Sequence, residues 1–442
     1  MDFRLREDLV MRGYASWNYK PYLPPDAEDR EGAPYLCRLI PRADGAEVSL
    51  SGAADGVTLY WREYGKTEDA WQSCRAEEPC SILRGLKKDC EYQIYAADRC
   101  GRRSHTRRFL TGDIPWTVVN YLHPEDGQYN FSGRFLCSPS LVRLENQTLL
   151  MSCDLYAPMA PQNLTLLFRS FDEGKTWHYL TDCMPCFWGK LFCHRGDLYM
   201  LGMSTEYGDV LIGKSTDGGE TWTEPRALLR GAGCTGRGWH RAPCTLLHAN
   251  GRIYTSLEYG AWGKGGFAAA VLSIDEDADL MQPESWTVSD LWNDPNIDAI
   301  EGNLVCAPNG DILDILRYKE GEAAVLKVSA DGKRVDFQGT VPFPMAHTKF
   351  EILQREDQTY VAVGNPPPMR NVLSVYTSKD LKDWKRALDV IDKHECDAQS
   401  VGFQYPSVLL EGDAVCIASR TAYHGADSFH NNNYLTFHRV HL

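Results

Sequence analysis

The feature that most constrains the fold is a unit that recurs from about residue 115 to the end of the chain. Each unit has an apolar strand, a turn with Asn or Asp before Gly, a second apolar strand, and a third strand that ends near Ser-x-Asp. Internal repeats of this period predict a propeller or a solenoid, in which neighbouring units bury each other's apolar faces. Six units, and hence six blades, follow from the first apolar residue after each turn: Leu149, Leu198, Ile253, Ile312, Tyr360 and Val415.

Two of the units end in nearly the same eight residues, SFDEGKTW and STDGGETW. In this pattern we expect the Asp side chain to bind turn amides, the Gly to adopt a positive φ, and the Trp to pack between sheets. Both segments resemble the Asp-box of sialidase-like propellers, a motif that marks a fold and carries no chemistry. The matching residues are Ser170, Asp172, Gly174, Thr176 and Trp177, then Ser215, Asp217, Gly219, Thr221 and Trp222.

Residues 35–112 show a different pattern, with short alternating strands between Gly, Asp and Lys turns, and this predicts a small β-sandwich. The segment ILRGLKKDCEYQIYAADRCG resembles the loop and strand of fibronectin type III domains, in which a Leu precedes a Tyr-x-Ile-x-Ala strand. We therefore expect an all-β chain with an extension at 1–34, a sandwich at 35–112 and a six-bladed propeller at 113–442. The final strand, NYLTFHRVHL, should pair with residues 116–122, because a propeller must close its ring.

Charge and composition narrow the class of partner. The net charge is −14 and no run of Lys or Arg is long enough to follow a phosphate backbone, so nucleic acid is not expected. The start, MDFRLREDLVMRG, lacks an apolar stretch, and no segment reaches about 18 apolar residues, so we expect a cytoplasmic protein without a membrane span. The 15 cysteines are interpreted mostly as buried thiols, and the pair Cys183 and Cys186 has no second pair at zinc spacing. Neither a metal site nor a cofactor is expected, and a homo-oligomer is left open.

Polar side chains recur at equivalent positions of the predicted blades. The residues five places after the anchors are Asp154, Met203, Glu258, Arg317, Asn365 and Arg420. The first strands carry further polar residues, in Cys137-Ser138, Trp239-His240-Arg241, Ile300-Glu301, His347-Thr348-Lys349 and Gln404-Tyr405. Burying such groups is costly unless they face water, a ligand or each other. The pattern predicts either a ligand-binding mouth or an ion-pair network that seals the channel.

Three segments resemble sialidases more specifically. The first blade strands of sialidases read R-I-P-S-L, and this chain has Arg241 in His-Arg-Ala-Pro, twelve residues before its anchor. Sialidases also have a Glu followed about sixteen residues later by an Arg of their carboxylate-binding triad, and Glu301 and Arg317 match this spacing. Their nucleophile lies in Y-S-x-L, which Tyr405-Pro-Ser-Val-Leu resembles.

This resemblance implies an exo-glycosidase of the sialidase superfamily that acts on an acidic sugar and retains its configuration. Tyr405 would be the nucleophile and Glu301 the base that takes its proton, because a phenol avoids the repulsion between a carboxylate nucleophile and an anionic sugar. Asp154 would be the general acid, with His240 as its substitute. Arginine forks bind carboxylates in a bidentate way, which assigns Arg241, Arg317 and Arg420 to the substrate. The other residues assigned to substrate binding are Glu258, Lys349, His424 and Trp239.

The sequence also departs from sialidases. The position of their first-blade arginine is Cys137 here, and the matching arginine lies on the third blade. The triad is therefore rearranged or absent, and Arg134 and Arg370 are the loop arginines that could complete it. The last hairpin is also unusually polar, and His424, Asp427 and His430 could bind a metal, act as acid and base, or form a solvated turn.

Two other functions remain open beside the glycosidase. The first is a lyase for uronic-acid-containing glycans, in which His240, His424 or Tyr405 abstracts a proton while an arginine neutralises the carboxylate. The second is a sugar-binding propeller without catalysis, whose charges are structural. In each case the expected partner is an oligosaccharide or a glycoconjugate.

Overall fold

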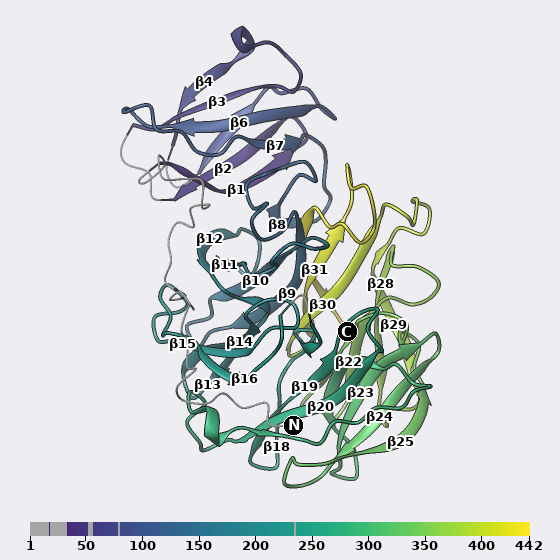
Figure 1. Ribbon diagram of the computed structural model, residues 1–442. Helices are drawn as coiled ribbons and strands as arrows, with labels where there is room; N and C mark the ends of the chain where they lie inside the picture. The colour runs from purple at the N-terminus through teal and green to yellow at the C-terminus, as the bar shows by residue number, and fades with distance from the viewer. Residues whose placement is uncertain (1–16, 18–32, 52–55, 78–79, 234–235) are drawn as a thin grey trace.

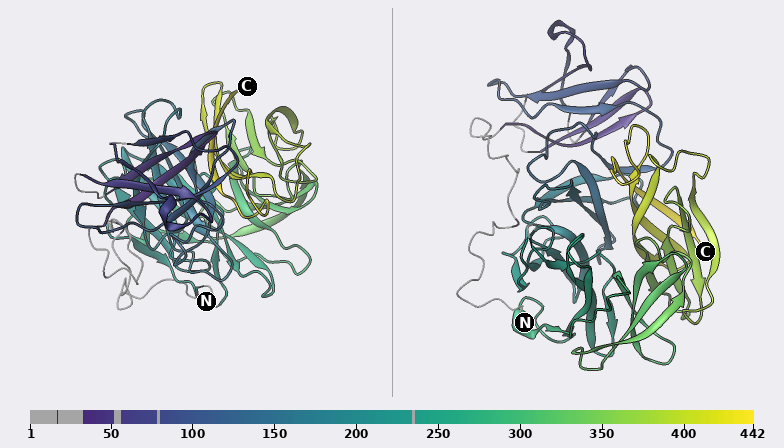
Figure 2. Two further views of the ribbon diagram at one scale, coloured as in Figure 1. Left: turned by 90° about the horizontal axis from the view of Figure 1, so that it is seen from above. Right: turned by 45° about the vertical axis from the view of Figure 1, so that its right-hand side comes forward.

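The computed structural model describes residues 17, 33–51, 56–77, 80–233 and 236–442. Apart from the short 3-10 segments η3 (Glu68–Ala70) and η4 (Pro283–Ser285), the regular structure in these ranges is β-strand. Six sheets follow one another around a ring, and two smaller sheets stand at one side of it (Figures 1 and 2). The expected all-β, six-bladed architecture is confirmed. Among the described residues, no helix has the length and apolar character needed to cross a membrane.

Each blade is one antiparallel sheet, and in blades 1, 2, 4 and 5 the strands pair in chain order. Blade 1 contains β9 (Phe135–Arg143), β10 (Leu149–Tyr156), β11 (Thr165–Ser170) and β12 (His178–Cys183). Blade 2 contains β13 (Phe187–His194), β14 (Asp197–Met203), β15 (Val210–Ser215) and β16 (Arg226–Leu229). Blade 3 contains β17 (Gly238–His240), β18 (Leu247–Ala249), β19 (Arg252–Gly260), β20 (Phe267–Asp275) and β21 (Thr287–Val288). Blades 4 and 5 are β22 (Ile300–Cys306), β23 (Ile312–Lys319), β24 (Glu322–Val328) and β25 (Val335–Pro342); and β26 (Glu351–Gln354), β27 (Tyr360–Gly364), β28 (Val372–Ser378) and β29 (Lys385–Asp392). The first five anchor residues lie on β10, β14, β19, β23 and β27, the strands that pair with the innermost strands, and Val415 takes the same place in blade 6.

Blade 6 closes the ring with strands from both ends of the propeller. It contains β30 (Gly402–Glu411), β31 (Ala414–Ala422), β32 (Tyr434–His441) and β8 (Thr117–Tyr121). Tyr434 pairs with Tyr121 and Leu435 with Asn120, so the last strand of the chain is bonded to the first strand of the propeller. The predicted closure is confirmed.

The two S-x-D-x-G-x-T-W segments form the same turn. In the first, Asp172 accepts bonds from the Thr176 amide at 2.8 Å and the Thr176 hydroxyl at 2.6 Å, and Gly174 has a φ of 81°. In the second, Asp217 makes the equivalent bonds to Thr221 at 2.9 and 2.5 Å. The indoles of both motifs are buried in the core between blades. These turns hold the outer strands and lie away from the reactive groups described below.

The two smaller sheets form a sandwich around one apolar core. One sheet has the order β1 (Tyr35–Arg42), β2 (Gly45–Ser51) and β5 (Ser81–Arg84), and the other has the order β4 (Gln72–Arg75), β3 (Thr58–Glu63), β6 (Glu91–Ala97) and β7 (Arg107–Leu110). Leu39, Val48, Leu59, Ile94 and Phe109 fill the space between them. The three-on-four arrangement is the kind of small sandwich that the alternating pattern predicts. Its kinship with fibronectin domains and the limits of the domain stay predictions.

Polar contacts as well as apolar ones join the sandwich to the propeller. Arg107 forms a fully buried ion pair with Asp126, with Nε 2.8 Å from Oδ2. Arg38 Nε donates to the Val119 carbonyl of β8 at 2.8 Å, and the hydroxyl oxygens of Tyr35 and Tyr129 are 2.6 Å apart. Since buried charged pairs are costly to separate, the sandwich has a fixed place on blades 1 and 6.

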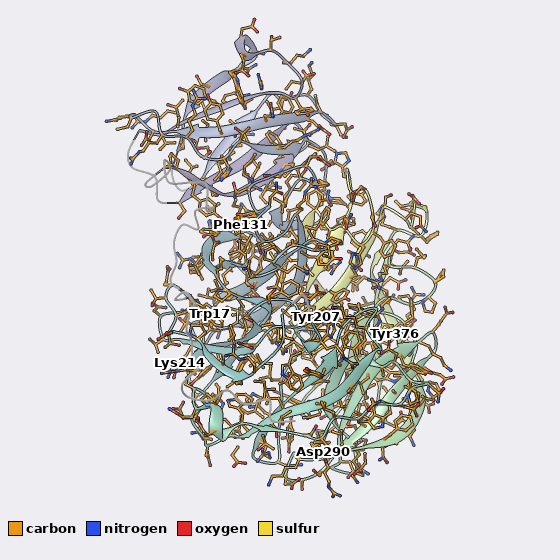
Figure 3. The ribbon with its side chains drawn as sticks, in the orientation of Figure 1. Trp17, Phe131, Tyr207, Lys214, Asp290 and Tyr376 are labelled. Atoms are coloured by element: carbon orange, nitrogen blue, oxygen red, sulfur yellow. The ribbon has the colours of Figure 1, made fainter. Side chains whose placement is uncertain are left out.

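The predicted extension at 1–34 lies mostly outside the described residues. Its one described anchor is Trp17, which is fully buried against blade 2 (Figure 3). Its Nε1 donates to the Pro185 carbonyl at 3.0 Å, and its ring meets Trp222 edge-on at 5.8 Å. The fourteen described cysteines are all free thiols.

Candidate active site

The innermost strands of four blades carry the same β-bulge near their starts. In each bulge two residues oppose one residue of the second strand, which turns the first side chain out of the regular alternation. The first residue of every bulge has a positive φ, of 35°, 50°, 57° and 52° in chain order. Such backbone costs of order 1–3 kcal/mol for a residue other than Gly and is concentrated at functional sites. The bulges are Ser138-Pro139, Trp188-Gly189, Glu301-Gly302 and Tyr405-Pro406.

Strand pairing places the predicted polar ring beside these bulges. Arg317 pairs with Ile300 and Arg420 with Gln404, so each lies next to the residue that precedes a bulge. Asp154, Met203 and Glu258 take the equivalent places on blades 1, 2 and 3. The five-residue spacing therefore does bring equivalent positions to one end of the propeller. We call this end, where β9, β13, β22 and β30 begin, the mouth.

Tyr405 and Glu301 meet at the mouth. The Tyr405 hydroxyl donates to Glu301 Oε1 at 2.7 Å, and Arg317 Nη1 donates to Glu301 Oε2 at 2.8 Å. Glu301 is only 2% exposed, whereas Tyr405 is half-buried. The carboxylate is thus held between a phenol and a guanidinium, with both of its oxygens used.

Charges around this pair set the proton affinities of both groups. Burial alone would raise the pKa of Glu301, but the Arg317 and His240 charges and the two hydrogen bonds lower that pKa to about 2. Burial and then the Glu301 charge raise the pKa of Tyr405 to about 12, against the opposing effect of three arginines. At neutral pH the pair is therefore a neutral phenol that donates to an ionised carboxylate.

Two more arginines complete a cationic cluster around Tyr405. The guanidinium carbon of Arg420 lies 4.6 Å from the Tyr405 ring centroid, and that of Arg370 lies 6.0 Å from it. Arg370 also donates to the Gln404 side chain, and burial lowers the pKa of Arg370 to about 10. Arg317 thus contacts the Glu301 carboxylate while Arg370 and Arg420 lie against the Tyr405 ring, and three guanidinium groups around this pair suit an anionic ligand.

Arg420 reaches across from blade 6 to blade 1. Its Nη1 donates to the Cys137 sulfur at 3.1 Å, its Nη2 to the His430 carbonyl at 2.8 Å, and its Nε to Asn432 Oδ1 at 2.5 Å. Cys137 is the position at which sialidases carry their first-blade arginine. A guanidinium therefore lies against this position, although its backbone belongs to another blade.

A histidine–carboxylate pair lies on blade 3. His240 Nδ1 is 2.7 Å from Glu258 Oε2, and Glu258 Oε1 accepts the amide of Gly302, the residue after Glu301. The imidazole packs 4.5 Å from the Trp188 ring and 6.4 Å from the Trp262 ring. Trp262 is 52% exposed, so its face is available to a ligand.

Two further imidazoles border the arginine cluster. The Arg420 charge, followed by burial, lowers the pKa of His430 to about 3, and the His430 ring meets Tyr156 edge-on at 5.3 Å. Burial and the Arg370 charge lower the pKa of His347, whose two ring nitrogens have no hydrogen-bond partner. Both imidazoles are therefore neutral at pH 7.

Asp154 lies deeper than a proton donor to a sugar should. It is fully buried, and its Oδ1 accepts the Thr165 hydroxyl at 2.5 Å. Burial raises the pKa of Asp154 to about 8, so it is protonated at neutral pH. A protonated carboxyl is the form that a general acid needs, but the Asp154 side chain is not exposed to solvent.

Three of the expected substrate contacts are structural in this arrangement. Arg241 is fully buried and donates to the carbonyls of Trp188 at 3.1 Å and Leu201 at 2.8 Å, which braces blade 2 against blade 3. Trp239 is fully buried in the core of the same two blades. We therefore no longer assign Arg241 and Trp239 to substrate binding. The third residue is Lys349, which belongs to the buried ion-pair network described next.

A buried ion-pair network fills the channel below the mouth. Lys190 Nζ lies 3.3 Å from Glu351 Oε1, and Lys349 Nζ lies 4.0 Å from Glu351 Oε2. The Val408 amide and the Thr245 amide also donate to Glu351, each at 2.6 Å. This network joins blades 2, 3, 5 and 6, so Lys349 has a structural role here.

The last hairpin divides between the mouth and the sandwich. His430 borders the arginines, whereas His424 Nε2 lies 3.0 Å from the Thr111 carbonyl and 3.4 Å from Asp89 of the sandwich. His424 is therefore a contact between domains and not a part of the mouth. Arg134 directly precedes β9, but its guanidinium donates to the Pro124 carbonyl at 2.8 Å and is not among the arginines that contact Glu301 or Tyr405.

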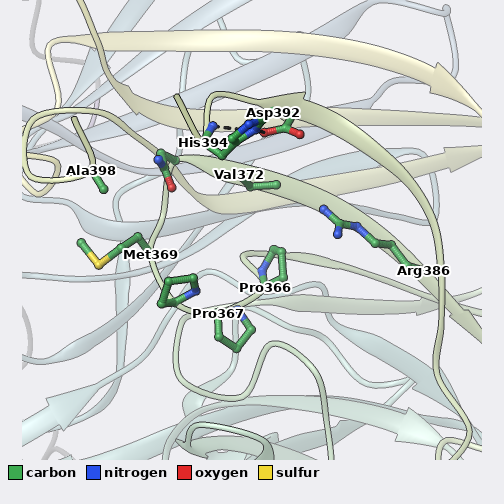
Figure 4. A pocket seen from close by; sticks show the side chains of 10 residues that line it. Pro366, Pro367, Met369, Val372, Arg386, Asp392, His394 and Ala398 are labelled. Carbon is green, nitrogen blue, oxygen red and sulfur yellow. Dashed lines mark hydrogen bonds and ion pairs between the residues drawn. The ribbon is translucent and has the colours of Figure 1, made fainter. Parts of the chain in front are cut away.

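The loop that carries Arg370 also borders a cavity of about 380 Å³ (Figure 4). The cavity is lined by residues on both sides of Arg370 in the chain, including Pro366, Met369 and Val372, but not by Arg370 itself. Asn365 fixes this loop by donating to the carbonyls of Val372 and Phe403, both at 2.7 Å. Arg370 is therefore held toward Tyr405 by a loop whose other side chains face the cavity.

Arg370, His430 and Trp262 lie at the mouth but were not among the assigned site residues. The sequence named Arg370 only as a loop arginine that could complete the triad, and His430 only as one residue of the polar last hairpin. Arg370 and Trp262 lie on loops between strands, and no repeat position marks them. The prolines before Arg370 and the polar run around His430 were the available signals, because both interrupt the regular strand pattern.

Comparisons with known proteins agree with this fold. Residues 198–417 match the family described as BNR repeat-like domain. Among curated proteins, no sequence matches the chain significantly. The solved structure of the Hadza microbial sialidase Hz136 is similar over 93% of this chain and 94% of its own, with a TM-score of 0.52 and 11% identity.

Two other solved structures cover the propeller. The Penicillium chrysogenum alpha-L-arabinanase complexed with arabinobiose has a TM-score of 0.52 and 15% identity over 74% of this chain and 98% of its own. The intramolecular trans-sialidase from Ruminococcus gnavus, in complex with oseltamivir carboxylate, has a TM-score of 0.50 and 10% identity over 73% of this chain and 97% of its own. The chain therefore contains a BNR repeat-like segment within a sialidase-like β-propeller, a fold that it shares with glycoside hydrolases.

Proposed function

We propose that this protein is a glycoside hydrolase that releases an anionic sugar and retains its configuration, with Tyr405 as nucleophile. The observation that carries the proposal is the hydroxyl of Tyr405, which donates to the buried Glu301 carboxylate inside a cluster of three arginines. The names of the similar structures support it, since one is a sialidase and another is a trans-sialidase that holds a carboxylate inhibitor.

Substrate binding would prepare the base as well as hold the sugar. Without substrate, Arg317 donates to Glu301 and helps to keep the pKa of that carboxylate near 2, which makes it a weak base. A substrate carboxylate beside Arg317 would share its guanidinium and reduce this effect, so the pKa of Glu301 would rise. An anionic substrate therefore strengthens the group that must take the Tyr405 proton.

The general acid is better supplied by His240 than by Asp154. His240 is oriented by Glu258, is linked to the Glu301 bulge through the Gly302 amide, and packs beside the exposed face of Trp262. A sugar that stacks on Trp262 would bring its leaving oxygen toward this imidazole. His240 is itself only 3% exposed, but it lies beside the exposed Trp262, whereas Asp154 is fully buried and its Oδ1 accepts the Thr165 hydroxyl. We therefore assign Asp154 a role in supporting blade 1.

A uronate lyase is the second candidate, and one observation favours it. His347 and His430 are neutral imidazoles beside Arg317, Arg370 and Arg420, so a base and a carboxylate clamp lie together. A lyase would use one of these imidazoles to remove the proton next to the carboxylate that the arginines neutralise. Its product would contain a new double bond, which a hydrolase does not form.

The test is turnover of a panel of aryl glycosides that includes sialic acid, uronic acids and neutral sugars. Aryl release and ultraviolet absorbance of the sugar are followed together for the wild type, Tyr405→Phe and Glu301→Gln. Tyr64→Phe, a change at an exposed tyrosine of the sandwich, is the matched control. Release from an anionic glycoside that falls at least a hundredfold in both site variants, without ultraviolet absorbance, supports the hydrolase.

Other results are equally informative. Absorbance of an unsaturated sugar that survives Tyr405→Phe and disappears in His347→Asn or His430→Asn would replace the hydrolase by the lyase. Turnover of neutral sugars alone, or turnover that is indifferent to Tyr405 and Glu301, would remove the site assignment.

A further inference from the structure

Three potential metal ligands meet at the junction of blades 2 and 3, on the face of the propeller opposite the mouth. His194 is the last residue of β13, His248 lies in β18, and Glu276 directly follows β20. One ligand atom from each lies within 4.8 Å of the other two. His248 Nδ1 is 3.2 Å from Glu276 Oε1, and the two imidazole centroids are 5.9 Å apart with their planes inclined by 31°.

His194 supplies a second, independent observation. The residue is 7% exposed, and its Nε2 is buried without any hydrogen-bond partner. A buried polar nitrogen left unpaired costs about 1–3 kcal/mol, so such atoms usually have a partner in native proteins. In contrast, His248 and Glu276 keep solvent access, which provides a path for an ion to reach this nitrogen.

We infer that His194, His248 and Glu276 bind one divalent transition-metal ion, with Zn²⁺ as the best match. Two imidazoles and a carboxylate are a common ligand set for zinc and leave a fourth position for water. Softer or purely oxygen-binding ions fit less well, because the set contains no sulfur and only one carboxylate. This site is distinct from the pair Cys183 and Cys186, at which the sequence analysis expected no metal.

The site stabilises the propeller and does not take part in catalysis. The ligands come from blade 2 and blade 3, so a bound ion would add a cross-link to two sheets that already meet through side-chain packing and the hydrogen bonds of Arg241. The ion pair between Arg195 and Asp277 crosses the same junction one residue further along each segment. His194 lies six residues after Trp188 in the β13 bulge, a span of about 20 Å, which is too far for contact with a substrate at the mouth.

Metal binding to the full-length protein tests this inference. The protein is treated with a chelator, kept reduced with a phosphine, and titrated with Zn²⁺ against a chromophoric indicator. We expect one tight equivalent in the wild type and a loss of affinity of at least tenfold in His248→Ala and in Glu276→Gln. Both side chains are partly exposed, so these variants should fold; His194→Ala is the third variant. His394→Ala is the matched control, because His394, Asp392 and Glu395 form an exposed cluster of similar composition.

Two further readouts separate this site from adventitious binding. Co²⁺ in the wild type should give the visible bands of a nitrogen- and oxygen-bound ion without the intense near-ultraviolet band of a thiolate. The melting temperature should rise with Zn²⁺ in the wild type and in His394→Ala, but not in His248→Ala. The absence of a tight equivalent, a thiolate band, or binding that the three ligand variants leave unchanged would overturn the inference. None of these results depends on catalytic activity.

Discussion

Replacing Glu301 with Gln should lower the pKa of Tyr405 and at the same time slow the reaction at neutral pH. Gln keeps the size of the side chain and still offers an oxygen to the Tyr405 hydroxyl, but it carries no charge and cannot take a proton. In the wild type, the Glu301 charge helps to raise the pKa of Tyr405 to about 12. Without that charge only burial opposes the three arginines, so the pKa of Tyr405 falls.

The size of the fall follows from the short distance between the two groups. Two unit charges about 4 Å apart interact by about 4 kcal/mol at an effective dielectric constant near 20, which equals about three pKa units. The pKa of Tyr405 in Glu301→Gln should therefore lie near 9, and about 1% of the phenol is ionised at pH 7. The wild type transfers its proton to Glu301 instead, so the variant should be about a hundredfold slower at pH 7. Its kcat should then rise about tenfold per pH unit until pH 9.

The assay is kcat against pH from 6 to 10 on an aryl glycoside whose leaving group needs no acid. The wild type should lack this rise, because the pKa of Glu301 is about 2 without substrate, and Glu301 stays ionised above pH 6 when the substrate carboxylate raises that pKa. The double variant with Glu301→Gln and Tyr405→Phe should be inactive at every pH. The difference between the ultraviolet absorbance of Glu301→Gln and that of the double variant, measured against pH, gives the titration of Tyr405 directly. Activity of Glu301→Gln that equals that of the wild type, or that stays flat with pH while Tyr405 titrates, would refute the base role.

Three other changes have results that the structure predicts. Lys190→Met leaves the buried Glu351 charge poorly compensated and should lower the free energy of unfolding by about 3–5 kcal/mol in urea denaturation; an unchanged midpoint would show that the channel network does not hold the blades. Trp262→Ala removes an exposed ring, so KM should rise about tenfold while kcat and the melting temperature stay near the wild-type values; a loss of stability instead would mean that this indole is structural. Burial raises the pKa of Asp314 to about 8 in the folded protein, above the value near 4 in the unfolded chain. The folded state therefore binds one more proton than the unfolded chain between these pH values, and the free energy of unfolding falls as the pH rises from about 4 to about 8. Asp314→Asn should therefore be more stable than the wild type at pH 9 and similar to it at pH 4, and thermal unfolding at the two pH values decides this.

Much of the fold was predictable because its signals are local and repeated. The turn after each first strand marks a fixed place in every blade, and counting from it brings Glu258, Arg317 and Arg420 to one end of the propeller. The bulges were not predictable, because a bulge depends on the pairing of two strands and leaves no fixed residue pattern. Yet the bulge is what turns Glu301 and Tyr405 toward each other.

The errors in the site assignment come from side-chain direction. Arg241 matches a motif and a spacing, but its guanidinium points into the junction with blade 2, where two carbonyls accept its protons. Arg420 shows the opposite case, since its long side chain reaches Cys137 on a neighbouring blade. A one-dimensional spacing places a Cα atom but not the far end of an arginine, which lies several ångströms away. Arg370 lies on a loop outside the repeat, so only the folded chain brings it to Tyr405.

The most direct test of the central claim is to trap the sugar on Tyr405. The protein is incubated with a fluorinated anionic glycoside that forms a glycosyl–enzyme intermediate but hydrolyses slowly, and the labelled peptide is identified by mass spectrometry. We predict one sugar per chain, attached to the Tyr405 oxygen and absent from Tyr405→Phe. A label on another residue, or rapid turnover of the parent glycoside with no label at all, would contradict the assignment of Tyr405 as the nucleophile.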